Sequence, residues 1–508
     1  MRYFFQVFLV ISILIFASSC RKDFDFPDSK GDLSFSKDTI FLDTVFTNIG
    51  SSTYTLKVYN KSTANVQIPT VNLAQGQESK YRLNVDGVPG KSFNNVPLFA
   101  KDSLYIFIET TFDVTTTNQN EFLYTDAILF DVGERQQKVE LVTLVKDAIF
   151  LFPSVLANGI KETIVLDLDK NGEEIKVEGF ELEQNQLHFT NQKPYVIYGY
   201  AAVPDGESLR IDAGSRVYFH KDSGILVQGG AKIHINGELS TDKDLLEKEV
   251  IFEGDRLEPS YNNTPGQWGA IWISEGSTNN TINHLTVQNA TIGLYVKGNG
   301  ILNTPTLTLT NSQIYNSSDT NLWAISAKIN AENTVLANAG NTSLYCSLGG
   351  TYNFGHCTIA NYWIHGFRTG AALNIDNFSS NSSFDLLAAN FTNSSIVGSN
   401  SIEMFLSSNN VNVFNYNFTN CLIDFNDRNS AFSENPLYDF ESVDYIDNLF
   451  NIETGFENTS QNQFALKINS AAINRGNLAK AQEIPLDILG QNRTVSPDIG
   501  AYEFQSEN

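Results

Sequence analysis

The sequence of 508 residues predicts an all-β protein, in which an N-terminal β-sandwich is followed by a right-handed parallel β-helix. Three observations lead to this prediction. The chain has 36 Phe and 20 Tyr but only 2 Met, and aromatic residues favour strands. Short runs within residues 33–148 alternate between apolar and polar side chains, as half-buried strands do. A six-residue motif recurs in the second half of the chain, which is typical of a solenoid.

The charge and the apolar content exclude two classes of protein. The chain has 33 Lys and Arg against 57 Asp and Glu, so its formal net charge is −24. A nucleic-acid backbone requires clustered cations, and we therefore expect no nucleic-acid partner. The hydrophobic content of 42% is sufficient for folded cores and excludes disorder along the whole chain.

Residues 1–20 have the pattern of an export signal. Arg2 supplies the positive charge, and the mostly apolar run from Phe4 to Phe16 is shorter than the roughly 20 residues that span a bilayer. The run ends in Ala17-Ser18-Ser19-Cys20, which resembles the lipobox of bacterial lipoproteins. This resemblance implies cleavage before Cys20 and lipidation of that residue. The alternative is an ordinary signal peptide with an incidental cysteine.

Residues 21–32 follow as a polar tether. Their start, Arg21-Lys22-Asp23-Phe24-Asp25, resembles the surface-export signal of some Gram-negative lipoproteins, and a plain solvated linker is the alternative. We therefore expect an outer-membrane lipoprotein that faces the cell surface rather than the periplasm. Its contact with the membrane is expected through the N-terminal lipid, because acyl chains anchor a protein by burying CH₂ groups.

The region 33–148 is predicted to be the β-sandwich, because about seven short strand-like runs are separated by turn residues. The words Asp43-Thr44-Val45-Phe46-Thr47 and Gly50-Ser51-Ser52-Thr53 resemble an immunoglobulin-like module of exported bacterial proteins. That resemblance implies a spacer between the membrane and the main domain, with ligand binding as the alternative. The clearest strand candidates are 33–36, 39–42, 54–59, 104–109, 127–130 and 139–145.

The six-residue motif predicts the main fold. Its first position is Asn or His, its fourth is Val, Ile or Leu, and its sixth is most often Asn. Equivalent residues on neighbouring coils of a parallel β-helix lie about 4.8 Å apart, so like residues stack on like. We therefore expect the fourth positions to form the core and the Asn side chains to bond to one another in columns. The copies are residues 284–289, 311–316, 333–338, 356–361, 393–398 and 420–425.

The motif and the strand-like runs before it set the predicted boundaries. The β-helix is expected at 200–430, after a connecting segment and N-terminal cap at 149–199 and before a C-terminal cap at 431–508. The widest spacing, from His356 to Asn393, indicates either a coil with an insertion or an additional divergent coil. The alternative fold is a β-propeller, whose repeat would be about 40–50 residues.

Residues 209–370 resemble the right-handed β-helix proteins of the pectate-lyase-like superfamily. The resemblance implies the fold and an exported location, and it does not select a reaction. Enzymes of this superfamily that cleave uronic-acid polysaccharides use clustered carboxylates, often Ca²⁺, and a basic Arg or Lys. The segments that carry the resemblance are 265–273, 356–363, 469–476, 487–493 and 498–504.

Candidate catalytic residues are few, because charged side chains are sparse in the predicted coils. The best group is His365, Arg368 and Asp376, near the widest motif spacing, and Asp424 with Asp427 is the second. Loop charges without a function are the alternative for both. No spacing of Cys, His or acidic residues predicts a metal site, so we expect no cofactor, with Ca²⁺ possible only for a lyase.

Aromatic side chains offer a non-catalytic site. Five rings are candidates for a sugar-binding platform, because apolar C–H faces of sugars pack on rings: Trp268, Trp272, Trp323, Tyr362 and Trp363. Core packing is the alternative for each of them. Cys357 and Cys421 are expected to be reduced core residues, since a coil with Ser394 separates them.

These observations lead to one functional expectation and two alternatives. We expect a cell-surface lipoprotein that binds glycans or mediates adhesion without catalysis, with a polysaccharide as a possible partner. The first alternative is a cell-surface polysaccharide lyase or glycoside hydrolase. The second is a structural component of the envelope.

Overall fold

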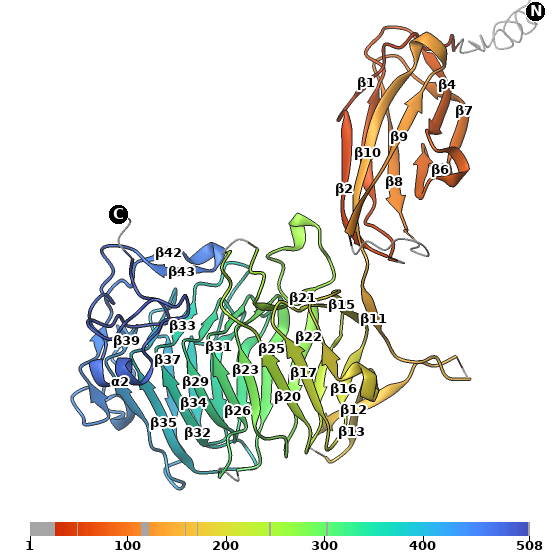
Figure 1. Ribbon diagram of the computed structural model, residues 1–508. Helices are drawn as coiled ribbons and strands as arrows, with labels where there is room; N and C mark the ends of the chain where they lie inside the picture. The colour runs from red at the N-terminus through yellow and green to blue at the C-terminus, as the bar shows by residue number, and fades with distance from the viewer. Residues whose placement is uncertain are drawn as a thin grey trace, which may run out of the picture. The chain divides into compact units, whose positions relative to one another are not determined.

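The computed structural model describes residues 26–47, 49–112, 121–157, 159–169, 171–242, 245–300 and 303–505. The predicted export signal, Cys20 and the start of the tether lie outside this part of the chain. Within it, no helix has both the length and the apolar character needed to cross a membrane. The chain forms two compact units, Met1–Asp147 and Ala148–Asn508, which Figure 1 shows in red to orange and in yellow to blue.

The first unit is a β-sandwich of two five-stranded sheets. One sheet has the order β1-β3-β8-β5-β6 and the other β2-β10-β9-β4-β7. In β10 the alternate residues Val139, Leu141 and Val145 are buried, as the period-two pattern predicts. The strands are β1 Ser34–Phe35, β2 Thr39–Phe46, β3 Tyr54–Tyr59, β4 Val66–Leu73, β5 Tyr81–Val85, β6 Val88–Gly90, β7 Ser92–Leu98, β8 Ser103–Thr110, β9 Glu121–Phe130 and β10 Gln137–Lys146.

The second unit is a parallel β-helix with three long sheets, whose coils follow one another in chain order (Figure 1). The first sheet contains β11 Ile149–Leu151, β15 Tyr195–Ile197, β18 Arg216–Phe219, β21 Val250–Gly254, β24 Leu285–Gln288, β27 Gln313–Tyr315, β30 Val335–Ala337, β33 Thr358–Asn361, β36 Ser395–Gly398, β39 Leu422–Ile423 and β41 Leu449–Phe450.

The second sheet contains β12 Thr163–Leu168, β13 Glu174–Glu181, β16 Tyr200–Val203, β19 Gly224–Val227, β22 Trp268–Ile273, β25 Ala290–Lys297, β28 Thr320–Ile325, β31 Thr342–Ser347, β34 Leu373–Asp376 and β37 Met404–Ser407. The third contains β14 His188–Phe189, β17 Ser208–Asp212, β20 Lys232–Asn236, β23 Asn280–Asn283, β26 Leu307–Thr310, β29 Lys328–Glu332, β32 Gly350–Gly355, β35 Leu386–Thr392, β38 Asn417–Thr419 and β40 Tyr445–Ile446. The all-β prediction, with a sandwich followed by a parallel β-helix, is confirmed.

The six-residue motif is the strand of the first sheet together with the turn before it. The third positions pair in register from Thr286 through Gln313 to Leu422. The fourth positions are all fully buried in the core, as expected. Every first position has a positive φ of 46–53°, which explains why Asn and His recur there: Asn in particular tolerates the left-handed region, and both can bond to the neighbouring coil.

The predicted Asn columns are present in part. Asn333 Nδ2 donates to Asn311 Oδ1 at 2.9 Å, and Asn393 Nδ2 lies 2.8 Å from His356 Nε2 on the next coil. Cys357 and Cys421 are free and buried, as expected.

The coils extend further than the predicted 200–430. Ile149 in β11 already pairs with Tyr195 in β15, and β41 still pairs with β39 at Leu449. The widest motif spacing is one enlarged coil, because β33 pairs directly with β36. The additional residues form the loops 362–372 and 377–385, on either side of β34.

The chain after β41 covers the outer face of the first sheet. This C-terminal tail contains β42 Phe456–Asn458, β43 Gln463–Leu466 and the helix α2 Leu478–Glu483, at the blue end of Figure 1. Apolar tail residues such as Phe464, Ile499 and Tyr502 pack against the outward side chains of the motif, including Val335 and Val397. The motif therefore has two apolar faces, one toward the core and one toward the tail.

Candidate functional site

A column of four aromatic side chains runs along the outer face of the second sheet. Trp272, Tyr295, Trp323 and Tyr345 occupy equivalent positions in β22, β25, β28 and β31 and pair in register. Their strand neighbours point to the core, so these four rings point outward. We call this set the aromatic column; each of its members belongs to a different, consecutive coil.

Ring stacking holds one end of the aromatic column and polar contacts hold the other. Trp272 and Tyr295 stack at a centroid distance of 3.8 Å, while the ring of Trp323 is turned by 75° relative to Tyr295. Trp323 and Tyr345 are nearly parallel at 19°, with centroids 5.6 Å apart. Trp323 Nε1 donates to Ser347 Oγ at 3.1 Å, and the Tyr345 hydroxyl donates to the Asp376 carboxylate at 2.6 Å. These two hydrogen bonds fix the orientation of Trp323 and Tyr345.

Asp376 stands beside the end of the column. Its second carboxylate oxygen accepts a hydrogen bond from the backbone N–H of Leu348 at 2.9 Å. Burial raises the pKa of Asp376, although its hydrogen bonds with Tyr345 and with backbone N–H groups oppose the shift. Sequence analysis grouped Asp376 with His365 and Arg368, whereas the structure places it with Tyr345.

A hairpin formed by β12 and β13 lies near the other end of the column. Asp167 in β12 forms an ion pair with Lys297 in β25, with an Nζ–Oδ1 distance of 2.8 Å. Ile164 and Val177 of the hairpin pack on an outward cluster around Leu226, which Trp272 also joins. Trp323 and Tyr345 lie further along the column, and we take these two rings as the centre of the candidate site.

Trp268 is not part of this face, which corrects the predicted platform. Its indole is 1% exposed and stacks on Phe219 inside the core, with centroids 4.2 Å apart. Its Nε1 donates to the carbonyl of Gln288 at 2.8 Å. Another ring of the predicted platform, Trp363, lies on the loop 362–372, where it makes an edge contact with His365 at 5.0 Å.

Arg368 holds this loop to the coils. Its Nη1 donates to Glu403 at 2.7 Å, its Nη2 also bonds to Glu403, and the two side chains are 3% and 0% exposed. Glu403 in turn accepts from the backbone N–H groups of Ala372 and Asn400. Arg368 therefore does not serve as a base for a substrate, because its guanidinium is bonded to Glu403 in a buried ion pair.

The two residues of the second catalytic candidate, Asp424 and Asp427, have separate partners in the structure. Asp424 accepts from the N–H of Gly398 at 3.1 Å, and burial, with the nearby charge of Glu403, raises its pKa to about 6. Asp427 instead accepts from the N–H groups of Ala431 and Phe432 and closes a turn. Within the described part of the chain, no hydrogen bond or ion pair joins His365, Asp376 or Asp427 to Arg368, so the five candidates form no single constellation.

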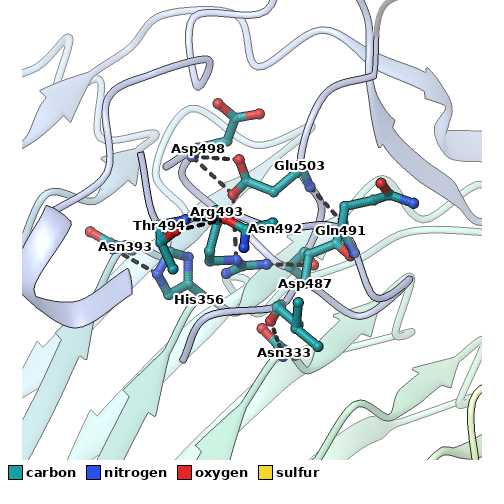
Figure 2. Close-up of polar contacts among 12 residues, drawn as sticks. Asn333, His356, Asn393, Asp487, Gln491, Asn492, Arg493, Thr494, Asp498 and Glu503 are labelled. Atoms are coloured by element: carbon teal, nitrogen blue, oxygen red, sulfur yellow. Dashed lines mark hydrogen bonds and ion pairs between the residues drawn. The ribbon is translucent and has the colours of Figure 1, made fainter. Parts of the chain in front are cut away.

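A buried group of charges lies under the C-terminal tail. Figure 2 shows Arg493 next to Asp487, Asp498 and Glu503, and we call these four residues the tail charge cluster. Arg493 Nε lies 3.4 Å from Glu503 Oε1, and the Arg493 side chain is 0% exposed. Asp487 and Asp498 accept backbone N–H bonds, for example from Glu503 to Asp487 at 2.8 Å. The cluster joins the turns of the last part of the tail to one another and is enclosed, so it does not offer a binding site.

The tail charge cluster should make the stability of the protein depend on pH. Burial, with the charge of Asp498, raises the pKa of Glu503 to about 7, from about 4.3 in an unfolded chain. Its contribution to folding is therefore fully present below about pH 4.3 and is lost as the pH rises through about 7. Glu503→Gln mimics the protonated form. The free energy of unfolding of this variant relative to the parent should therefore increase from pH 5 to pH 8, by roughly 3 kcal/mol at most. Its unfolding temperature relative to the parent should rise accordingly.

Glu503→Gln must be compared with the parent at each pH, because His356 changes the stability of both proteins with pH in the opposite direction. Burial lowers the pKa of His356 well below its usual value, so its contribution is lost on acidification. A difference between Glu503→Gln and the parent that stays constant from pH 5 to pH 8 in calorimetry would contradict the assignment to Glu503.

No metal site emerges from the geometry. Among the described residues, no group of three or more His, Cys, Asp or Glu side chains is arranged to hold an ion.

Comparisons with known proteins add the following findings. No model of a known family matches the sequence, and neither does any curated protein. The chain is similar to the catalytic unit of the thermostable GH87 α-1,3-glucanase of Streptomyces thermodiastaticus strain HF3-3, with 11% identity over 72% of this chain and 74% of that chain and a TM-score of 0.30. The Agl-KA catalytic domain gives 12% identity, 72% and 77% coverage and a TM-score of 0.23.

The periplasmic chaperone SfaE is matched over 23% of this chain and 57% of that chain, with 11% identity and a TM-score of 0.16. This chain therefore spans little more than half the length of the chaperone that it matches. At such identities and scores, the three likenesses carry no argument about activity.

Proposed function

We propose that this protein is a lipid-anchored cell-surface protein that binds glycans without cleaving them. The observation that carries the proposal is the aromatic column, in which four consecutive coils each carry one ring in register and Trp323 and Tyr345 form the partly exposed end. Strands of neighbouring coils lie about 4.8 Å apart, a repeat similar to the length of one hexose unit. Two successive sugar rings of an extended chain can therefore contact Trp323 and Tyr345.

The charged groups beside the column favour binding over catalysis. Asp167 is paired with Lys297, and Asp376 is bonded to Tyr345 and to the backbone of Leu348. Glycoside hydrolysis uses two carboxyl groups about 5–10 Å apart with different roles. The second candidate function is a glycoside hydrolase, which the raised pKa of Asp376 favours, because a protonated acid beside bound sugar could donate to a leaving group.

Trp323→Ala tests the proposal. This substitution removes the central ring of the candidate site, and we expect the affinity for a bound neutral polysaccharide to fall about tenfold, since a ring contact contributes roughly 1 kcal/mol or more. Affinity would be measured by isothermal titration calorimetry with soluble glucans, mannans and xylans, while released reducing ends are recorded. Tyr105→Ala, at an exposed aromatic residue of the sandwich, is the matched control.

Three outcomes are informative. Unchanged affinity in Trp323→Ala, together with unchanged affinity in Tyr105→Ala, would exclude the column as the binding site. Release of reducing ends would favour the hydrolase, and Asp376→Asn would then be the first active-site substitution. Absence of both binding and cleavage would leave a structural role in the envelope.

A further inference from the structure

A polar groove lies on the outer face of the third sheet, away from the aromatic column. It has a volume of about 530 Å³ and runs across β26, β29, β32, β35 and β38, with α2 of the tail contributing to its lining. Its floor includes Asn330, Asn353 and Asn390, and Glu332 and Lys480 contribute charges. The volume lies within the range of about 300–1,000 Å³ that is common for ligand sites.

The floor of the polar groove is a column of amides in register. Asn330 pairs with Asn353, and Asn353 with Asn390, on consecutive strands. Asn353 Nδ2 donates to Asn330 Oδ1 at 3.0 Å, and Asn390 Nδ2 donates to Asn353 Oδ1 at 2.9 Å. Asn353 uses one N–H and one oxygen lone pair in this column, Asn330 uses only a lone pair and Asn390 only one N–H, so each amide keeps at least one donor and one acceptor. The coils therefore offer a donor and an acceptor about every 4.8 Å along the groove.

The tail closes one side of the groove at a glycine. A side-chain carbon at Gly355 would lie 2.7 Å from Lys480 Cε and 2.8 Å from Ile484 Cδ1, so a larger residue there would displace these two side chains. Lys480 Nζ forms an ion pair with Glu483 at 2.9 Å. The approach of α2 places a second polar wall beside the amide column.

Glu332 is the charged group of the floor that remains available. Its side chain is half-buried in β29, one coil before Gly355. Among the described residues, its carboxylate forms no hydrogen bond or ion pair. A carboxylate with unused acceptor capacity, next to amides with unused donors and acceptors, matches the alternating hydrogen-bonding groups of a polyhydroxylated chain.

We propose that the polar groove is a second glycan site, which binds a neutral glycan chain by hydrogen bonds rather than by ring stacking. Its axis follows the coils, so one sugar unit would face each amide. Acidic polysaccharides are disfavoured, because Glu332 faces the groove and the protein carries a net charge of −24. The site is separate from the aromatic column, so this proposal does not depend on the proposed function.

The test uses the full chain and hexasaccharides of neutral sugars, namely α-1,3-, β-1,3- and β-1,4-linked glucose and β-1,4-linked mannose. In a Trp323→Ala background, in which binding at the aromatic column is weakened, binding of at least one of them should persist in calorimetry. Asn353→Ala in that background should weaken this binding at least tenfold. Asn381→Ala, at an exposed loop residue, is the matched control and should leave it unchanged.

A second variant guards against misfolding, because Asn353→Ala also removes part of the amide column. Glu332→Trp leaves the three amides in place and fills the groove, and it should abolish the same binding event. Loss of binding in either variant, with an unfolding temperature close to that of the parent, supports the site. The proposal is overturned if no hexasaccharide binds in the Trp323→Ala background, or if both folded groove variants bind as that background does. If Asn353→Ala weakens binding and Trp323→Ala does not, the aromatic column is excluded as a glycan site and the polar groove is supported.

Discussion

Arg493→Ala should destabilise the β-helix by about 3–5 kcal/mol, which is the usual cost of removing one partner from a buried ion pair. Arg493 is the cation among the three buried carboxyl groups of the tail charge cluster. Without it, these groups must either remain ionised without a counter-charge or take up protons. Calorimetry at pH 7.5 would show the loss as a lower unfolding temperature, and limited proteolysis should cut the tail first.

The control for this prediction is Arg475→Ala, in the same tail but at an exposed position. A surface substitution of this kind is expected to change stability by about 0.5 kcal/mol or less. Similar small effects of both substitutions would mean that Arg493 does not stabilise the tail.

Arg368→Ala should have an effect of similar size, about 3–5 kcal/mol, for the same reason. Here the residue left behind is Glu403, whose side chain is 0% exposed. The loop 362–372 would also lose its main attachment to the coils, so protease cleavage within it should accelerate. Unfolding temperature and the rate of cleavage are the two measurements.

A double substitution makes this prediction sharper. Arg368→Ala combined with Glu403→Gln should recover part of the lost stability, because the uncompensated charge is removed. Arg428→Ala, at an exposed arginine after Asp427, is the control and should leave both measurements unchanged. A double variant no more stable than Arg368→Ala would contradict the explanation by a buried charge.

The regular coils could be predicted from the sequence because stacking repeats the same requirement at the same position. The first position of the motif needs a positive φ and the fourth needs an apolar side chain, and both requirements remain visible in the sequence. Residues 149–199 contain no such motif, since the hairpin of β12 and β13 interrupts the first coil. For that reason the coils in this region were predicted only as a cap.

The site was predicted less well because it depends on local irregularities. Trp268 and Trp272 are four residues apart in one strand and would face the same side of a regular sheet. A register shift between Ala270 and Ile271 reverses the alternation, so Trp268 faces the core and Trp272 faces outward. Likewise, Glu403 lies 35 residues from Arg368, and no local pattern indicates that the two side chains meet.

The C-terminal tail changes how the coils can come apart. In a linear array, each coil contacts only its neighbours, so the last coil could peel away alone. Here the Tyr502 hydroxyl donates to Gln313 at 2.9 Å, the Ala501 N–H to Thr358 at 3.1 Å and the Gly500 N–H to Asn393 at 2.8 Å. One short segment is thus fastened to β27, to β33 and to the turn before β36. A pulling force on the end of the chain is shared among these coils, and the β-helix from β27 to β36 resists it as one mechanical unit.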